Sequence, residues 1–312
     1  MDAAFSLDGR RMATASFDQT AQVYEIGTNP PAPPTFLIHT NVVRRVAFCP
    51  TKPLLATAAY DGYVRLWELP TGRLIDFRQH GTRIHGLAFS DSGDKLASGS
   101  GKTVKIWRLF EKLEPLREFE EQSEVWDVAF SPDGRLIASA CFDGVVRVRE
   151  ANSGAIQSEI RQEGSVFGVA FSRDGCCLLT VSTAKTARIW DTRTGLPLTD
   201  PFAQSSELVA GRFGADGQCV VTATADGTVR GWPFASHVST QTPSWWPGYV
   251  ESFACKRADG MGAIHDNLPQ PFEYWRSRRD FKAESPEAAL ASWLENRAHG
   301  SQKTPLNKTT PN

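Results

Sequence analysis

A repeated motif with a period close to 41 residues constrains this chain more than any other feature. Each copy is a short apolar run that ends in Phe and is followed by an Asp-Gly turn or a close equivalent, as in VAFSPDG at 128–134. Consecutive copies are separated by 43, 41, 41, 41 and 42 residues, and the six phenylalanines are Phe5, Phe48, Phe89, Phe130, Phe171 and Phe213. Periods of roughly 20–50 residues are typical of solenoids and propellers. The chain must therefore fold as a series of similar units.

Within each unit the pattern is that of β-strands. Apolar and β-branched residues form short runs, such as YVRLW at 63–67 and LIASA at 136–140, with Gly or Asp between them every 8 to 12 residues. This pattern is typical of antiparallel strands joined by tight turns. A fourth run, such as RLIDF at 73–77, follows in most copies. Four strands in each unit predict an all-β propeller of six recognisable four-stranded blades.

The third run of each copy closes on an aromatic residue in five cases, 18 or 19 positions after the Phe. The closing residues are Tyr24, Trp67, Trp107, Arg149, Trp190 and Trp232. Together with the period and the turns, this series of closing residues resembles WD40 repeats, and Trp190-Asp191 is a literal WD pair. The resemblance covers residues 1–233 and implies a WD40 β-propeller. The expected repeats are 1–38, 39–79, 80–120, 121–161, 162–203 and 204–233.

The resemblance also implies a buried hydrogen-bond network in each blade, joining a His, a Ser or Thr, an Asp and the closing Trp. Such polar groups are tolerated inside a protein when they satisfy one another. We expect the network to contain His39, Thr57, Asp61, Trp67, His80, Ser139, Asp143, Asp226 and Trp232. In the later copies the His place holds Glu121, Gln162 and Gln204. Arg149 replaces an aromatic residue and would need a carboxylate or a stacking partner.

WD40 propellers generally bind partners on the face around the central channel, which directs attention to two sequence columns. One lies four residues before each Phe and the other lies one residue before the Asp place. Their aromatic and cationic members are the expected partner-binding residues: Arg44, His85, Trp126, Phe167, Phe17, Tyr60 and Phe142. Aromatic residues and Arg are enriched in interface hot spots. Plugging of a narrow channel is the alternative role for the aromatic side chains.

Enzymatic and metal-binding motifs are not found in the sequence. The run SGSGKT at 98–103 imitates a phosphate-binding loop, but Leu96 stands where the loop needs Gly and a strand follows it. We therefore expect no cofactor, no metal and no catalytic residue. The net charge of −1 favours neither nucleic acid nor any other partner. No apolar run is long enough to span a membrane. The six cysteines lack C-x-x-C pairs and are expected to be free, buried thiols of a cytoplasmic protein.

The periodicity stops after Trp232-Pro233, and residues 234–299 are expected to form an α-helical C-terminal extension followed by a disordered tail at 300–312. Its order of WW, R-x-R-R and A-x-W-L motifs resembles the segment after the WD40 repeats of large bacterial serine/threonine kinases. Kinase motifs themselves are absent, so a kinase module would lie upstream in a longer parent protein. Since the first copy starts almost at Met1, either the segment after Trp232 completes the sixth blade or further blades belong to a longer chain, and we favour the second.

Two functional hypotheses follow from the sequence. The first is a non-catalytic platform for protein or peptide binding, in a regulatory or scaffolding part of a bacterial signalling protein. The second is a propeller enzyme, a hydrolase or lyase, that acts on a small molecule at the channel mouth. The partner-binding columns contain no carboxylate, which favours the first hypothesis.

Overall fold

The computed structural model describes residues 2–28, 32–214, 217 and 219–234, together with the backbone of 257–258 and 264–265. The described chain is entirely β-structure. Five antiparallel sheets have four strands each and a sixth has three, and consecutive strands of each sheet are neighbours. Each sheet corresponds to one sequence repeat and is numbered here as one blade, so the all-β, WD40-type prediction is confirmed.

The strands follow the chain in order from the ring centre outward. Blade 1 contains β1 (Asp2–Phe5), β2 (Arg11–Ala15), β3 (Thr20–Glu25) and β4 (Thr35–Ile38). Blade 2 contains β5 (Val43–Phe48), β6 (Leu54–Ala59), β7 (Tyr63–Glu68) and β8 (Arg73–Gln79). Blade 3 contains β9 (Ile84–Phe89), β10 (Lys95–Ser100), β11 (Thr103–Leu109) and β12 (Leu113–Glu120).

The second half of the chain repeats the same arrangement. Blade 4 contains β13 (Val125–Phe130), β14 (Leu136–Cys141), β15 (Val145–Glu150) and β16 (Ile156–Arg161). Blade 5 contains β17 (Val166–Phe171), β18 (Cys177–Ser182), β19 (Thr186–Asp191) and β20 (Phe202–Ala203). Blade 6 contains β21 (Leu208–Phe213), β22 (Cys219–Thr224) and β23 (Val229–Pro233).

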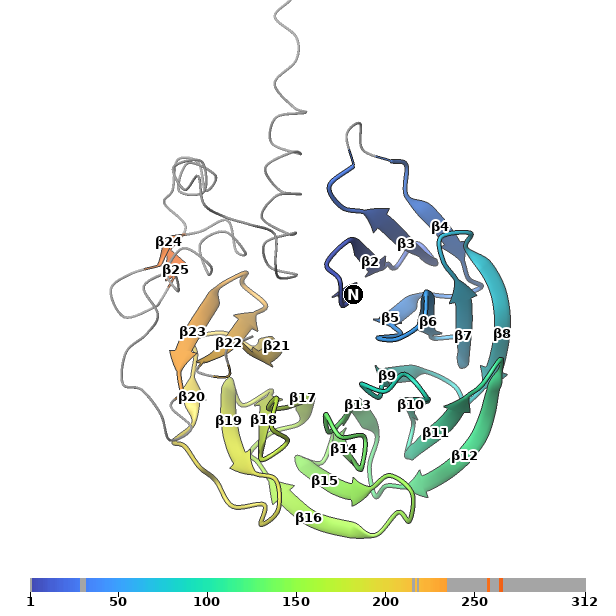
Figure 1. The fold of residues 1–312 in the computed structure, drawn as a ribbon. Coiled ribbons are helices and arrows are strands. Elements are labelled where there is room, and N and C mark those ends of the chain that lie inside the picture. The colour runs from blue at the N-terminus through green and yellow to red at the C-terminus, as the bar shows by residue number, and fades with distance from the viewer. Residues whose placement is uncertain are drawn as a thin grey trace, which may run out of the picture.

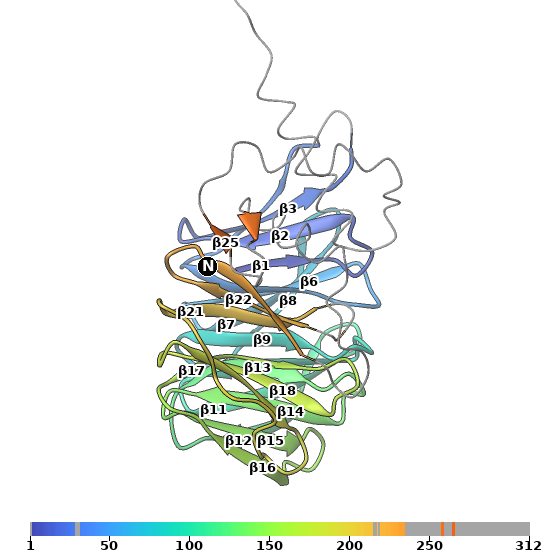
Figure 2. The ribbon, with the colours of Figure 1, turned by 90° about the vertical axis from the view of Figure 1, so that its left-hand side faces the viewer.

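The six blades follow one another around a central axis (Figure 1), with the first strand of each blade innermost. Seen from the side, the long axes of the strands in all blades are roughly aligned, with neighbouring strands antiparallel (Figure 2). The inner strands β1, β5, β9, β13, β17 and β21 therefore surround the axis. The first residues of all six inner strands therefore lie at the same face of the ring.

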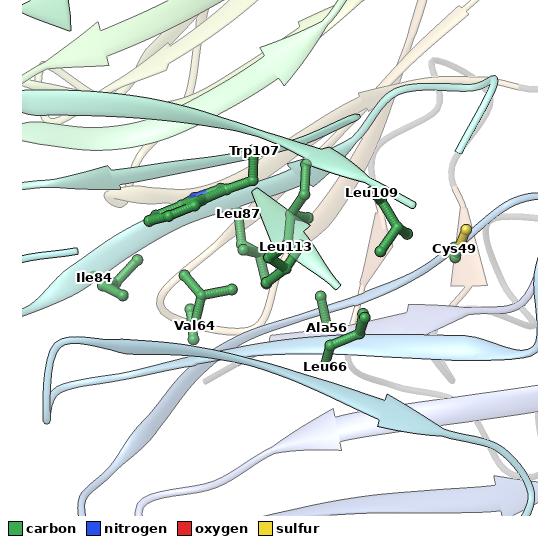
Figure 3. Close-up of a cluster of buried hydrophobic side chains, with 11 residues drawn as sticks. Cys49, Ala56, Val64, Leu66, Ile84, Leu87, Trp107, Leu109 and Leu113 are labelled. Atoms are coloured by element: carbon green, nitrogen blue, oxygen red, sulfur yellow. The ribbon is translucent and has the colours of Figure 1, made fainter. Parts of the chain in front are cut away.

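Apolar packing between neighbouring blades forms the core. Five clusters of buried side chains fill the five interfaces from blade 1 to blade 6. Between blades 2 and 3, Val64 and Leu66 of β7 lie opposite Ile84 of β9 and Trp107 of β11 (Figure 3). Because each cluster joins two successive blades, each repeat is stabilised chiefly by its neighbours.

Four sequence expectations differ from the structure or lie beyond it. Blade 6 has three strands, not four, among the described residues. The expected helical extension lies outside the described residues, except that β24 (Arg257–Ala258) and β25 (Ile264–His265) pair as a short antiparallel sheet. The 300–312 tail also lies outside them. Of the cysteines expected to be buried, Cys176 is exposed, because it lies in the turn before β18.

Shortening a side chain at a blade interface should destabilise the ring. Leu66 is fully buried between blades 2 and 3, so Leu66→Ala should lower the free energy of unfolding by about 3 kcal/mol through lost burial and a residual cavity. Leu7→Ala is the matched control, since Leu7 is 73% exposed. Denaturant titration measures both, and equal effects of the two substitutions would contradict this account of the core.

Candidate functional site

The inner strands of blades 2 to 6 each contain a β-bulge near their start. The register between the first and second strands shifts by one residue in blades 2 to 6. The extra residue in each case is the one four positions before the Phe: Arg44, His85, Trp126, Phe167 and Val209. A bulge interrupts the alternation of side chains and redirects the extra residue. The first sequence column is therefore a column of bulge residues.

The second column lies beside the first because of main-chain hydrogen bonds. The amide of Tyr60 donates to the carbonyl of Val42, and the amide of Phe142 donates to that of Glu124, at 2.9 and 2.8 Å. Each bond joins the turn between the second and third strands to the residue two positions before the bulge. The two columns therefore share one face of the ring.

Five of the seven expected partner-binding residues form one continuous group of rings, which we call the aromatic surface: Tyr60, His85, Trp126, Phe142 and Phe167. Ring centroids are 5.3 Å apart for Tyr60 and His85, and 4.8 Å apart for His85 and Trp126, which stack. Trp126 also contacts Phe167 at 4.9 Å and stacks on Phe142 at 6.1 Å. Offset and tilted arrangements at these distances are favourable. The aromatic surface extends across blades 2 to 5.

The two remaining predicted residues take different positions. Arg44 is half-buried and lines the central cavity together with Trp126 and Phe167. Phe17 is 68% exposed in the turn between β2 and β3, and it does not join the ring contacts of the aromatic surface. Arg44 thus belongs to the same site as the aromatic surface, and Phe17 lies apart from it.

A cavity of about 380 Å³ opens beside the aromatic surface at the ring centre. Its walls come from the inner strands of blades 1, 2, 4, 5 and 6, and four of the five bulge residues line it. The size falls within the range of roughly 300–1,000 Å³ that is usual for ligand pockets. Among the described residues, Trp126 and Phe167 line this cavity and do not close it.

Three carboxylates, those of Asp2, Asp127 and Glu207, line this cavity. The sequence columns missed Asp2 and Asp127 because these residues lie one position further along. Asp2 and Asp127, three residues before Phe5 and Phe130, both pair with Arg45, at 3.7 and 3.3 Å. Arg45 also donates from Nε to the carbonyl of His85, at 2.7 Å. Each carboxylate also accepts from an inner-strand amide, Asp2 from Val46 and Asp127 from Val169. The charged column three residues before Phe was the available sequence signal for this inter-blade network.

Electrostatics keep His85 neutral at physiological pH. Burial lowers its pKa to about 4, and the nearby charges of Arg44, Arg45 and Arg83 act in the same direction. Its Nε2 lies 3.4 Å from Oε1 of Glu124. Nδ1 of His85 and Nε1 of Trp126 are shielded from solvent and have no hydrogen-bond partner among the described residues. The aromatic surface therefore holds two polar groups whose hydrogen-bonding capacity is unused.

A buried hydroxyl in the second strand organises the blade beneath this surface. Thr57, Ser98, Thr180 and Thr222 each accept a hydrogen bond from the indole N–H of the closing Trp, at 2.8 to 2.9 Å. The same hydroxyl contacts the side chain 18 residues earlier, which is His39 in blade 2 and His80 in blade 3. Gln162 and Gln204 occupy that position in blades 5 and 6. The amide of Gln thus replaces the imidazole of His. We call this chain of hydrogen bonds, from the closing Trp to the hydroxyl and on to His or Gln, the relay.

In blade 4 an ionic version replaces this relay. The Ser139 hydroxyl donates to Glu121 at 2.7 Å, and the Glu121 carboxylate also accepts from Arg147 at 2.9 Å and from Arg149 at 3.2 and 3.3 Å. The Arg149 guanidinium lies 5.8 Å from the centre of the Phe119 ring. The side chain of Glu121 is fully buried. The carboxylate and the stacking partner that Arg149 requires are therefore Glu121 and Phe119.

The aspartates of the expected network serve the turns. Asp61 accepts from the Thr40 hydroxyl, the Tyr63 amide and the Arg65 guanidinium. Asp143 and Asp226 accept from the amides two residues further on, those of Val145 and Thr228. An Asp side chain commonly stabilises a turn in this way. Asp61 is thus bonded to Thr40, Tyr63 and Arg65, whereas the ring nitrogens of His39 contact the Leu37 carbonyl and the Thr57 hydroxyl.

The relay imidazoles should make the fold sensitive to acid. Burial lowers the pKa of His39 to about 4 and that of His80 to about 3, with Arg65 and Lys105 acting in the same direction. Protonation therefore favours the unfolded chain, and stability is lost as pH falls below the ordinary value of about 6.5. Each imidazole should contribute a loss of about 1.4 kcal/mol per pH unit between pH 6.5 and its folded-state pKa.

The double variant His39→Gln/His80→Gln tests this dependence, because Gln fills the same place in blades 5 and 6. Its free energy of unfolding should fall less steeply than that of the wild type between pH 6.5 and 4.5. Denaturant titration across this range gives both slopes. Equal slopes would show that these imidazoles do not titrate as proposed.

Removing the Glu121 charge should destabilise blade 4. Glu121→Gln leaves Arg149 without its carboxylate partner and removes one of the two carboxylates paired with Arg147, whose other partner is Glu159; breaking a buried pair costs about 3–5 kcal/mol. Glu121→His/Arg149→Trp restores the residue types of blades 2 and 3 and should recover part of that loss. Denaturant titration measures both variants; a change below about 0.5 kcal/mol for Glu121→Gln would contradict the assigned role.

Two further structural findings concern membranes and metals. In the part of the chain that the structure describes, no helix is long and apolar enough to cross a membrane. Among the same residues, no group of three or more His, Cys, Asp or Glu side chains is placed to hold a metal ion.

Comparison with known proteins agrees with this geometry. Coronin-7 of Rattus norvegicus is 37% identical over 109 residues, which make up 32% of this chain and 12% of that protein. A Periodic tryptophan protein 2 homolog of Neurospora crassa is 32% identical over 102 residues, 32% of this chain and 11% of that protein. Apoptotic protease-activating factor 1 of Rattus norvegicus is 33% identical over 156 residues, 49% of this chain and 12% of that protein.

The chain thus spans only about an eighth of the length of these relatives. A family match covers far more of it: the family described as IFT122 first beta-propeller matches residues 1–255. The structure agrees with that match. It has six blades in sequence order, and in four of them the closing Trp donates a hydrogen bond to the hydroxyl of the second strand. The chain belongs to the IFT122 first beta-propeller family of WD40 β-propellers.

Proposed function

We propose that this protein is a non-catalytic interaction platform that binds a protein or peptide on the aromatic surface. WD40 propellers generally act in protein–protein interaction and scaffolding. The observation that carries the proposal is the joining of Tyr60, His85, Trp126, Phe142 and Phe167 into one group beside an open cavity. Phe142 is 54% exposed at the tip of its turn. Exposed aromatic side chains grouped around a cavity are typical of interface hot spots.

The enzyme alternative is less well supported. The cavity is large enough for a small molecule, and it is lined by the carboxylates of Asp2, Asp127 and Glu207. Asp2 and Asp127, however, pair with Arg45 and accept from main-chain amides. These two carboxylates therefore serve the contacts between blades, and Glu207 alone does not supply the converging acid, base and nucleophile of a hydrolase or lyase site.

The finer expectations remain part of the proposal. A role in bacterial signalling, and an upstream kinase module, rest on the sequence of residues 234–299, almost all of which lie outside the described residues. The relatives named above are eukaryotic proteins. A cytoplasmic location rests on the cysteine pattern. Binding of nucleic acid is not expected from the net charge, and no membrane association is expected because the apolar runs of the sequence are short.

Truncating the aromatic surface should abolish partner binding and leave the ring folded. Trp126→Ala/Phe142→Ala removes two of the stacked rings, so capture of the partner in a pull-down should fall at least tenfold, as expected for about 1.4 kcal/mol or more of lost hot-spot energy. The thermal unfolding midpoint is measured in parallel. Phe110→Ala is the control, since Phe110 is a comparably exposed aromatic residue, 60% accessible, in the turn after β11. Equal binding by both variants, or unfolding of the double variant, would remove support for the proposal.

A further inference from the structure

We propose that residues 249–276 form a seventh, three-stranded blade that packs between blade 6 and blade 1 of the same chain. The inference does not depend on the proposed function. Three observations support it: an uncovered sheet face on each of the two end blades, the continuation of the repeat spacing beyond blade 6, and the pairing of β24 with β25.

Blade 1 has a sheet face that is covered in every other described blade. In blades 2 to 6 the residues seven and nine positions after the Phe lie on the side of the preceding blade, and their exposed fraction is at most 3%. Met12 and Thr14 are the equivalent residues of blade 1, and both are only half-buried. Blades 1 and 6 are the two ends of the described series (Figure 1). This face of blade 1 therefore lacks the neighbouring blade that covers its counterparts.

Blade 6 has the opposite sheet face uncovered. In blades 1 to 5 the residues eight and ten positions after the Phe lie on the side of the following blade and are buried. Val221 and Ala223 are the equivalent residues of blade 6, and both are half-buried. Among the described residues, the five apolar clusters join successive blades and none joins blade 6 to blade 1. Burial of these two faces against a further sheet is favourable, as it is between the other blades.

The repeat spacing continues into the residues after blade 6. The chain extends for 78 residues beyond Phe234, the last described residue of that blade. Phe253 lies 40 residues after Phe213, close to the earlier steps of 41 to 43. The turn Asp259-Gly260 follows, and Trp275 lies 16 residues after its Asp. The same interval of 16 residues separates the turn Asp from the closing residue in blades 1, 4, 5 and 6.

The run that ends at Trp275 has the composition of a third strand. The corresponding runs of blades 2, 3, 5 and 6 are VRLW, VKIW, ARIW and VRGW, and residues 272–275 are FEYW. The first and third positions of this run pack against the next blade, as Val64 and Leu66 pack against blade 3 (Figure 3). Phe272 and Tyr274 are therefore expected to face blade 1, and Trp275 to face blade 6. Glu273 departs from the cationic residue of the other runs.

The described part of this segment is β-structure. β24 and β25 pair as antiparallel strands. They flank the turn Asp259-Gly260, as the first two strands of blade 4 flank Asp133-Gly134. The interval from Trp232 to Phe253 is 21 residues, against 22 to 24 in the earlier blades, so it leaves the usual length for a fourth strand of blade 6. Over residues 249–276 the seventh blade replaces the helical extension that was expected.

Photocrosslinking on the full chain identifies what covers blade 1. The photoreactive residue p-benzoylphenylalanine replaces Met12 on the uncovered face or, as a control on the same blade, Leu7, which is 73% exposed in the turn between β1 and β2. Unlabelled and isotope-labelled chains are mixed before irradiation, so that a crosslink between two copies carries both labels. Crosslinks from position 12 should reach residues 249–276 of the same chain, and those from position 7 should not.

Two tryptophan substitutions test the seventh blade without a crosslinker. Trp275→Ala removes its closing residue, so the thermal unfolding midpoint should fall by about 5 °C or more, as expected for the loss of a packed Trp. Trp293→Ala is the matched control, because Trp293 lies in the same C-terminal region but beyond the proposed blade. It should change the midpoint by about 1 °C or less, as is usual for a substitution outside a packed core.

The possible outcomes distinguish the seventh blade from other ways of covering these faces. Crosslinks from position 12 that reach only blade 6 would show that the two end blades meet directly, and crosslinks that carry both labels would show a second copy; either result overturns the proposal. Equal midpoints for Trp275→Ala and Trp293→Ala would also overturn it. The aromatic surface lies on blades 2 to 5, so each of these results leaves the proposed function in place.

Discussion

A hydroxyl buried in the second strand of each blade is the constraint on which the ring depends. In blades 2 to 6 this hydroxyl is nearly inaccessible, so it must be bonded inside the protein. The side chain that bonds to this hydroxyl comes from the loop before the inner strand. In each of these blades it lies five residues before the bulge residue, as His39 lies before Arg44 and Glu121 before Trp126. The relay therefore fixes where each inner strand begins. The bulge, and the side chain that it directs to the channel, follow from that position.

Blade 4 meets the same constraint with different chemistry. A carboxylate replaces the imidazole, two guanidiniums supply the donors that an indole supplies elsewhere, and Ser139 keeps its place. Buried charges are tolerated only when they are paired and fully hydrogen-bonded, and Glu121 accepts from three different side chains. The replacement of His by Glu and of Trp by Arg is thus one coupled change. Blade 4 is also the blade that contributes Trp126 and Phe142 to the aromatic surface.

Much of the fold could be predicted from the sequence, because repeats, turns and strands are local patterns. The spacing of the phenylalanines and of the Asp-Gly turns places the blades. Of the residues in the column four positions before Phe, Arg44, Trp126 and Phe167 line the cavity and His85 stacks on Trp126, while their role in partner binding stays a prediction. The pairing of Asp2 and Asp127 with Arg45 was missed. The three residues share one column, three positions before Phe, but the column does not tell which blades its members join across the ring. A strict alternation of side chains would also have separated Arg44 from the channel. Only the bulge brings it there.

We propose that the bulge residues and the adjacent turns form the face that binds the partner. Site-specific photocrosslinking tests this most directly, with p-benzoylphenylalanine placed at position 142 on the aromatic surface and, separately, at position 110 in the turn after β11. Crosslinking is carried out on the full chain in the cells that produce it, and the attached peptides are identified by mass spectrometry. A partner crosslinked from position 142 and not from position 110 is the predicted result. Equal crosslinking from both positions, or crosslinking from position 110 alone, would contradict the claim.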